Sequence, residues 1–161
     1  MNDRSEIKLY PVITVWLKNY LLSKYKNAEI SVFDTHKTNL SKFLQIKSLH
    51  RKFSEFDTFE IKTDITAVLT IKERTELVFV EVKSNPITLK DIGQLLGYCR
   101  VAKPIEAFLI SPEGISTALH NLLIKYGKID ILGFEKNMIK IAKWNIDSND
   151  IDYSSIIPRG K

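Results

Sequence analysis

Residues 61–84, IKTDITAVLTIKERTELVFVEVKS, contain two strand-like runs that decide the fold. The runs 61–71 and 77–84 flank the polar segment KERTE, a pattern that predicts a β-hairpin. Side chains along a strand alternate between the two faces of a sheet. Positions 65, 67, 69 and 71 of the first run and 78, 80 and 82 of the second are all apolar. We therefore expect these positions to share one face, because a one-residue slip would turn one set outward.

The opposite face of the hairpin gathers three charged side chains, Asp64, Glu81 and Lys83. A turn near Arg74 and Thr75 would place Asp64 opposite Lys83, with Glu81 one diagonal step away, so that the side chains lie about 5–8 Å apart. Two carboxylates at that spacing form an oxygen site suited to Mg²⁺, which usually keeps several waters. With a lysine beside it, such a site is suited to phosphodiester cleavage.

The rest of the chain predicts alternating helices and strands. In chain order these are a helix at 11–26, a strand at 28–33, a short helix within the basic stretch 35–59, the hairpin, a helix at 89–102, a strand at 105–110, a helix at 115–126, strands at 129–134 and 138–144, and a polar tail from about 147. Thr88 and Asp91 give the capping signal for the 89–102 helix. This order predicts an α/β fold with a mixed central sheet flanked by helices.

Length and composition indicate one domain of an ordinary globular protein. The chain has 161 residues, 44% of them hydrophobic and 27% charged. A single cysteine, Cys99, excludes a disulfide framework, and His36, His50 and His120 show no ligand spacing. We expect Cys99 to be a core residue and the histidines to be bystanders. No apolar run reaches membrane-spanning length and the start has no signal-peptide pattern, so we expect an intracellular, cytoplasmic protein with no membrane partner.

Asp64, followed after sixteen residues by Glu81-Val82-Lys83, resembles the PD-(D/E)xK nuclease superfamily. The helix DIGQLLGYCRVA adds Gln94 and Tyr98, similar to the Gln-x-x-x-Tyr motif of RecB-type members. The resemblance covers about residues 60–102. It implies a restriction-endonuclease-like αβββαβ core, as in Holliday-junction resolvases. Thr63 stands where many members have proline, and the single cysteine excludes the iron–sulfur branch.

The resemblance also implies a role for each motif residue. Asp64 and Glu81 would bind Mg²⁺, or Mn²⁺ in its place, together with the backbone carbonyl of Val82. Lys83 would position the attacking water or stabilise the phosphate, and Gln94 would support the site. Glu6 is similar to a helix-one glutamate that contacts the metal through water in some members, and Tyr98 either packs or supports Gln94.

Only one of three Glu-x-Lys sequences has this context. Glu6 lacks an upstream acid on a strand, and Asp57 stands too close to Glu60 for separate paired strands. Glu81 alone follows an apolar strand and precedes a glutamine-bearing helix. The alternative interpretation of these residues is ordinary surface: an exposed ion pair at a sheet end, a helix-surface amide at Gln94 and a solvated carboxylate at Glu6.

A basic stretch precedes the hairpin and predicts contacts with nucleic acid. Residues 35–54 hold five basic side chains and no carboxylate, in a chain whose net charge is +5: Lys37, Lys42, Lys47, Arg51 and Lys52. The alternative is a solvated surface. We expect a Mg²⁺-dependent nuclease, an endonuclease acting on duplex or branched DNA, with a non-catalytic nucleic-acid-binding or assembly subunit as the alternative. Proteins of this type commonly act as homodimers, but the sequence reveals no dimer interface.

Overall fold

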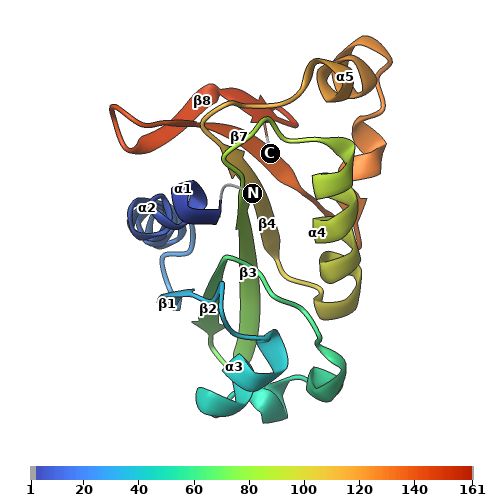
Figure 1. The fold of residues 1–161 in the computed structure, drawn as a ribbon. Helices are drawn as coiled ribbons and strands as arrows, with labels where there is room; N and C mark the ends of the chain where they lie inside the picture. Colours follow the sequence, from blue (N-terminus) through green and yellow to red (C-terminus); the bar gives the residue numbers. More distant parts are fainter. Residues whose placement is uncertain (1–2, 161) are drawn as a thin grey trace.

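A six-stranded mixed sheet forms the centre of the protein, with helices on both faces (Figure 1). The computed structural model describes residues 3–160. Its helices are α1 (Asp3–Ile7), α2 (Tyr10–Lys24), α3 (Leu40–Ile46), α4 (Leu89–Ala102) and α5 (Thr117–His120), with the short helical turns η1 (His50–Lys52), η2 (Phe56–Thr58), η3 (Asn121–Lys125) and η4 (Ile129–Leu132). Its strands are β1 (Glu29–Asp34), β2 (Ile65–Ile71), β3 (Arg74–Val82), β4 (Glu106–Ser111), β5 (Gly133–Phe134), β6 (Asn137–Met138), β7 (Lys140–Asn145) and β8 (Asp150–Ile157).

The strands lie in the order β1-β2-β3-β4-β7-β8. The first three form an antiparallel meander, β4 and β7 continue the sheet in parallel with β3, and β8 returns antiparallel at the far edge. The parallel crossover from β3 to β4 runs through α4, as such connections require a segment that returns along the sheet. The predicted mixed sheet flanked by helices is therefore confirmed.

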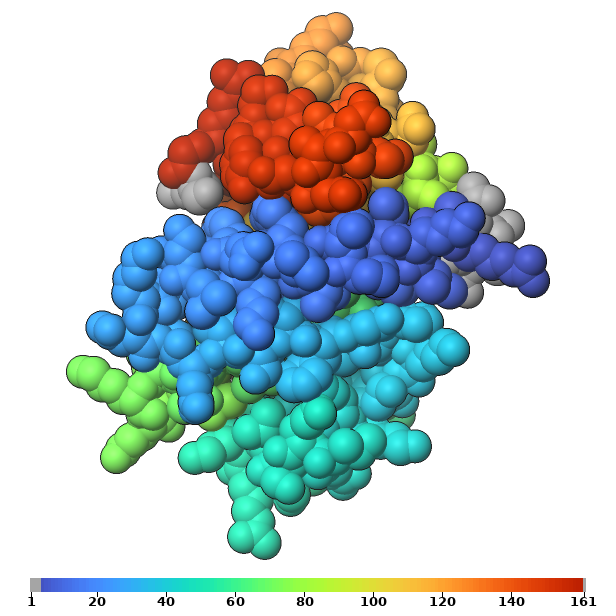
Figure 2. All heavy atoms as spheres, turned by 90° about the vertical axis from the view of Figure 1, so that its left-hand side faces the viewer, coloured from blue at the N-terminus to red at the C-terminus, as the bar shows by residue number. Residues whose placement is uncertain are grey.

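Two hydrophobic cores, one on each face of the sheet, follow the alternation read from the hairpin. The face covered by α2 buries Ile65, Ala67, Leu69, Val78, Val80 and Val82. The opposite face, covered by α3, α4 and α5, buries Val68, Leu77 and Phe79. In the space-filling view, α2 crosses the molecule between the β7–β8 end and residues 30–60 (Figure 2). Both cores are shielded from solvent. This explains why both strands of the hairpin are apolar on both faces over most of their length.

The hairpin turn is tighter than the sequence indicated, and the register is shifted. Ile71 pairs with Arg74, so the turn consists of Lys72 and Glu73, with Lys72 at φ 56°. Two-residue turns of this kind match the twist of paired strands. The register pairs Ile65 with Val80. Continued by one residue, it sets Asp64 opposite Glu81, and the expected pairing of Asp64 with Lys83 was wrong.

The C-terminal third differs most from the expectation. The polar tail predicted from about residue 147 is instead the edge strand β8, whose Ile151 is buried against Trp144 of β7. The strand predicted at 129–134 is mostly the helical turn η4, followed by a two-residue hairpin strand. The helix predicted at 115–126 is confirmed as α5 continued by η3. Across residues 3–160, no helix combines the length and apolar character that a membrane crossing needs.

Candidate active site

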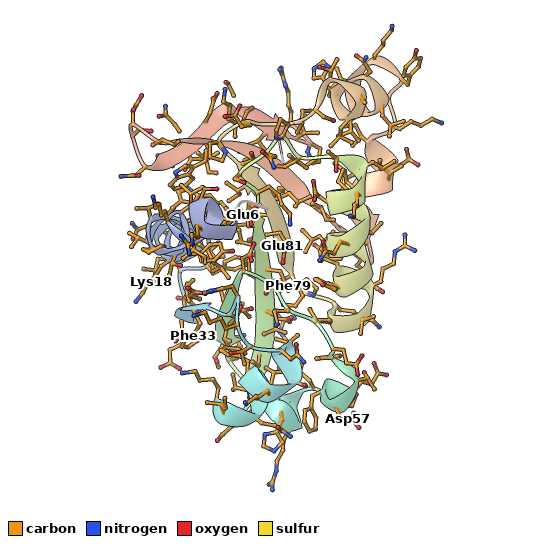
Figure 3. All side chains as sticks on the ribbon, in the orientation of Figure 1. Glu6, Lys18, Phe33, Asp57, Phe79 and Glu81 are labelled. Carbon is orange, nitrogen blue, oxygen red and sulfur yellow. The ribbon has the colours of Figure 1, made fainter. Side chains whose placement is uncertain are left out.

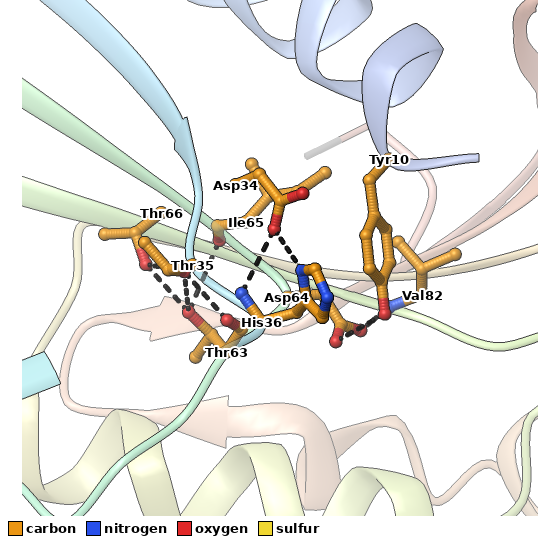
Figure 4. Close-up of polar contacts among 9 residues, drawn as sticks. All are labelled: Tyr10, Asp34, Thr35, His36, Thr63, Asp64, Ile65, Thr66 and Val82. Atoms are coloured by element: carbon orange, nitrogen blue, oxygen red, sulfur yellow. Dashed lines mark hydrogen bonds and ion pairs between the residues drawn. The ribbon is translucent and has the colours of Figure 1, made fainter. Parts of the chain in front are cut away.

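Asp64 lies just before β2, at the end of the hairpin where β3 also finishes. Its Oδ2 accepts a hydrogen bond from the backbone N–H of Val82 at 2.8 Å, and its Oδ1 accepts one from the Tyr10 hydroxyl at 2.8 Å (Figure 4). Because Asp64 stands outside the strand, side-chain alternation does not fix its direction. These two donors hold it instead, one from the neighbouring strand and one from α2.

Glu81 is a buried carboxylate at the centre of the sheet (Figure 3). The residue is only 5% exposed, and its Oε1 has no hydrogen-bond partner within the described part of the chain. Its Oε2 lies 3.8 Å from the Lys83 ammonium. A buried oxygen without a partner is costly unless some other group compensates for it. The Oε1 atom is therefore available as a ligand for a cation or as an acceptor for water.

The electrostatics of the two carboxylates reflect burial and mutual repulsion. Burial, reinforced by the nearby charge of Asp64, raises the pKa of Glu81 to about 8, although Lys83 opposes the shift. Burial also raises the pKa of Asp64, against the hydrogen bonds from Val82 and Tyr10. The Tyr10 hydroxyl has its pKa raised by burial and by Asp64, so it stays a hydrogen-bond donor. Two carboxylates that repel each other in a buried place form a site that favours a divalent cation.

Lys83 and α4 complete one side of the site. The Lys83 ammonium lies 4.0 Å from Asp91 Oδ1, in the first turn of α4. Asp91 also accepts a hydrogen bond from the Thr88 backbone N–H at 2.8 Å, which confirms the predicted cap. Gln94 follows one turn later but is exposed, and its amide donates to the Tyr98 hydroxyl at 3.1 Å. The structure therefore brings Lys83 to the carboxylates and leaves Gln94 and Tyr98 paired with each other on α4.

Glu6 approaches the same end of the sheet from α1. Its Oε1 accepts hydrogen bonds from the backbone N–H of Ser84 at 3.0 Å and the Ser84 hydroxyl at 3.4 Å. Its charge also raises the pKa of Glu81 and Tyr10. Figure 3 shows Glu6 and Glu81 close together in that view. The predicted supporting position of Glu6 at the carboxylate pair is thus compatible with the geometry.

The basic stretch occupies the α3 end of the molecule. Its five side chains, Lys37, Lys42, Lys47, Arg51 and Lys52, are all exposed. The Lys47 ammonium lies 4.3 Å from the centre of the Phe33 ring, a cation–π contact. Lys37 is three residues beyond the end of β1, while the others follow along α3 and η1. The stretch is an exposed basic surface beside the hairpin.

Sequence reasoning missed several residues around Asp64. Tyr10 stands in the first turn of α2 and gives no sign in the sequence of its contact with Asp64. His36, expected to be a bystander, lies against the Tyr10 ring, with 5.0 Å between ring centroids. Thr35 and Thr63 belong to a buried hydroxyl cluster with Thr66 (Figure 4). Only two features of the sequence hinted at these residues: the polar Asp34 that ends β1, and Thr63, which stands where the resemblance expects proline. Neither feature was specific.

Asp64 and Glu81 are the candidate donors for a divalent cation. Among residues 3–160, no group of three or more His, Cys, Asp and Glu side chains is placed to hold a metal ion. Asp64 and Glu81 offer two carboxylates, and Mg²⁺ is commonly bound in proteins through one or two carboxylates with waters filling the other positions. The partnerless Oε1 of Glu81 is an available ligand atom. The residues present therefore fit a hydrated Mg²⁺ or Mn²⁺ ion.

Comparison of the chain with family models, with curated proteins and with solved structures found no match in any of the three.

Proposed function

We propose that the protein is a metal-dependent nuclease of the PD-(D/E)xK type that hydrolyses phosphodiester bonds in DNA. The observation that carries the proposal is the buried Glu81 carboxylate, with one oxygen lacking a protein partner, beside Asp64 and Lys83. A protein that only needed a stable sheet would not gain from this arrangement, because a buried charge without compensation is destabilising. In a site that binds a cation and a phosphate, the cation would compensate for this charge.

The topology supports the same proposal. The elements α2-β1-β2-β3-α4-β4 occur in the αβββαβ order, with β1, β2 and β3 antiparallel and β4 parallel to β3. Asp64 and Glu81 stand at the end of the central hairpin, and α4 begins directly after the site. This is the place that the resemblance assigns to the carboxylates and the lysine.

Each residue has a distinct role in the proposed reaction. Asp64 and Glu81, with the Val82 backbone carbonyl, hold the cation, and Tyr10 keeps Asp64 in place. When bound, the cation supplies Lewis-acid activation of a water molecule and neutralises charge at the phosphate. Lys83 orients the attacking water or stabilises the charge that develops on the phosphate. Glu6 supports this arrangement from α1, through its hydrogen bonds to Ser84. The resemblance also assigns a supporting role to Gln94, whose amide donates to the Tyr98 hydroxyl in the structure.

A cleavage assay tests the proposal directly. Supercoiled, linear, single-stranded and four-way-junction DNA are incubated with the purified protein in Mg²⁺, Mn²⁺, Ca²⁺ or EDTA. We expect cleavage with Mg²⁺ or Mn²⁺ and none with EDTA. Asp64→Asn and Glu81→Gln remove ligand charge at constant volume and should abolish cleavage. Lys83→Ala should lower the rate about 10²–10³-fold, as removal of one preorganised donor does, with a smaller loss of metal affinity.

The chain supplies its own matched control. Glu60 begins a second Glu-x-Lys sequence, but it is exposed and lies outside the sheet. Glu60→Gln should therefore cleave like the unmodified protein. Cleavage that persists in Glu81→Gln would show a contaminant or a different site. DNA binding without cleavage in any metal would favour the alternative, a non-catalytic subunit that keeps the nuclease fold.

A further inference from the structure

A cavity of about 600 Å³ is lined by the last two strands of the sheet, β7 and β8, and by the segment that carries α5 and η3. Figure 1 shows α5 beside this end of the sheet. None of the residues that line the cavity belongs to the candidate active site. Its volume lies within the range of roughly 300–1,000 Å³ that is usual for small-molecule pockets. The cavity is therefore a candidate for a second binding site.

The lining of this cavity is mostly aliphatic. Six isoleucines contribute to it: Ile115, Ile124, Ile129, Ile141, Ile156 and Ile157. Their exposure ranges from 1% for Ile141 to 50% for Ile124, so the hollow has a buried floor and an open rim. Among residues 3–160, no Phe, Tyr or Trp side chain lines it, so it lacks the stacking surface that a nucleobase or another flat ring would use. This lining favours an aliphatic chain, whose burial removes apolar surface from water on both sides.

Two permanent positive charges also line the cavity, on Lys143 of β7 and on Arg159 just after β8. Both side chains are exposed, and neither takes part in the ion pairs found among residues 3–160. Glu113 is the one carboxylate in the described lining, and it is exposed. Asp152 lies within electrostatic range of Lys143 but does not line the cavity. The positive charges therefore favour an anionic group at this place.

The turn that follows β4 constrains the position of Lys143. Gly114 in this turn has φ 70°, and a Cβ added there would lie 3.8 Å from Lys143 Cδ. The methylene stem of the lysine thus lies against the turn, as long cationic side chains often do while their charged ends stay in water. The turn is itself attached to the segment before α4, because the Ile87 N–H donates to the Gly114 carbonyl at 2.9 Å. Lys143 therefore contributes an apolar stem to the wall and a charge to the rim.

We propose that this cavity binds an aliphatic chain that ends in a carboxylate, as in a free medium-chain fatty acid. The chain fills the space between the isoleucines, and the carboxylate meets Lys143 and Arg159 at the rim. An arginine guanidinium can hold a carboxylate through two parallel hydrogen bonds. A free acid fits better than a lipid bilayer, because the apolar surface is concave and a flat membrane surface cannot enter it. This binding does not depend on the proposed nuclease function.

A series of ligands tests the chain and the charge separately. Isothermal titration calorimetry compares hexanoate, octanoate and decanoate, each below its micelle-forming concentration, with octanol and with vesicles of phosphatidylglycerol. We expect one saturable site whose affinity rises about fourfold for each added CH₂, which corresponds to about 0.8 kcal/mol per buried methylene. Octanol should bind about tenfold or more weakly than octanoate, because it lacks the charge that the two cations recognise. The vesicles should not bind.

Variants at exposed positions locate the site. Lys143→Gln combined with Arg159→Gln should weaken octanoate binding about tenfold or more and leave octanol binding unchanged. The matched control removes two exposed charges from the α2 region, by Lys18→Gln and Lys26→Gln, and should bind octanoate like the unmodified protein. Ile124→Glu adds a carboxylate at the rim and should weaken octanoate binding more than Ile124→Gln, which has the same size. Thermal unfolding of each variant checks folding.

Three results would overturn the proposal: no saturable binding of any of the three acids, unchanged octanoate affinity in the variant that lacks both cations, or equal affinity for octanoate and octanol. Binding of the vesicles without binding of the free acids would show a membrane-facing surface and would also refute the proposed occupant. These results leave the nuclease function untouched, because the cleavage assay tests it separately.

Discussion

At the scale of single residues, the buried Glu81 carboxylate lowers the stability of the folded protein. Its carboxylate is almost fully buried among apolar neighbours of the central sheet, and one oxygen lacks a protein partner. The pKa of about 8 means that the folded protein without metal keeps a proton on this group at neutral pH. Binding of a cation would displace that proton, so cation affinity is expected to rise with pH.

Glu81→Gln should stabilise the metal-free protein at high pH. The folded pKa of Glu81 lies above its ordinary value of 4.5, so the folded state holds the proton more tightly than the unfolded state. The free energy of unfolding therefore falls as pH rises from about 4.5 to about 8. Glutamine does not titrate, so the free energy of unfolding of the variant should not show this decrease. At pH 9 in EDTA we expect the variant to be more stable by roughly 2 kcal/mol, the order of a desolvation penalty.

Urea denaturation at pH 6 and pH 9 measures the difference. Mg²⁺ should stabilise the unmodified protein and leave Glu81→Gln unaffected, because the proposed function requires that only the unmodified protein binds the ion. Glu60→Gln serves as the exposed control. A variant less stable than the unmodified protein at pH 9 would contradict the account of Glu81 as an uncompensated charge.

At the scale of elements, three buried threonines join the ends of β1 and β2. The hydroxyls of Thr35 and Thr66 lie 2.9 Å apart, those of Thr63 and Thr66 lie 2.8 Å apart, and Thr35 also reaches the Thr63 carbonyl. The cluster occupies the turn that carries Asp64 and His36. Thr63 stands where the resemblance would place a proline, and its hydroxyl takes part in this cluster, which a proline could not do.

Thr35→Val should lower both stability and activity. Valine matches the shape of threonine but leaves the Thr63 carbonyl and the Thr66 hydroxyl with fewer partners in a buried place. We expect a loss of about 1–3 kcal/mol in the free energy of unfolding, measured in urea, and a reduced cleavage rate at saturating metal. Exposed Thr58 provides the control: its hydroxyl bonds the Glu55 carbonyl near the surface, and Thr58→Val should cost much less. Equal losses in both variants would contradict a special role for the cluster.

The basic surface on α3 and η1 should govern the salt dependence of DNA binding. Lysine and arginine side chains that neutralise phosphates each contribute about 0.9 to the log–log salt slope on duplex DNA. Replacing Lys47, Arg51 and Lys52 together with alanine should weaken binding and reduce that slope by up to about 2.7, with metal binding unchanged. A second triple variant serves as the control and replaces three exposed lysines elsewhere with alanine, namely Lys125, Lys128 and Lys136. This control should bind DNA like the unmodified protein. Fluorescence anisotropy across salt concentrations measures both, and an unchanged slope would place the DNA-binding surface elsewhere.

Across the whole molecule, α2 is attached to the sheet at both ends. Its first turn supplies Tyr10 to Asp64, and its last turn meets Glu106 at the start of β4. The buried Glu106 carboxylate accepts hydrogen bonds from the Tyr20 hydroxyl at 2.7 Å, Lys24 at 2.9 Å and the Lys140 ammonium of β7. The helix that supplies Tyr10 to the candidate site is thus anchored at its opposite end by Glu106.

Glu106→Gln should destabilise the protein and change its response to acid. Burial would raise the pKa of Glu106, but hydrogen bonds from Lys140 and Lys24 outweigh it and hold the pKa below 4.5. The stability that this carboxylate contributes is therefore present above about pH 4.5 and is lost as pH falls through its folded pKa. At pH 7 we expect a loss of roughly 3–5 kcal/mol, because the variant leaves buried Lys140 unpaired.

Unfolding measured from pH 3 to pH 7 should show a flatter acid profile for Glu106→Gln than for the unmodified protein. Exposed Glu113 gives a control, and Glu113→Gln should follow the unmodified profile. A Glu106→Gln variant as stable as the unmodified protein at pH 7 would contradict the structural role of the network.

The sequence by itself determined the parts of this protein that short-range rules govern. Strand alternation assigned the two faces of the β2–β3 hairpin, and the cap of Thr88 and Asp91 located the start of α4. The same alternation put Glu81 and Lys83 on one face, and a stretch of basic residues marked an exposed surface. These features depend on residues a few positions apart, where chain geometry leaves few options.

Only the tertiary structure decided the rest, because it depends on contacts between distant segments. The two-residue turn at Lys72 and Glu73 shifted the register and put Asp64 opposite Glu81. Tyr10 reaches Asp64 across 54 positions of the chain, and no periodic pattern links them. Nothing in the sequence links His36 to Asp64, and only the threonine cluster between the ends of β1 and β2 brings the two residues together. Strand β8 was polar enough to resemble a tail, since an edge strand needs few apolar residues once its neighbour β7 supplies hydrogen bonds and a packed face.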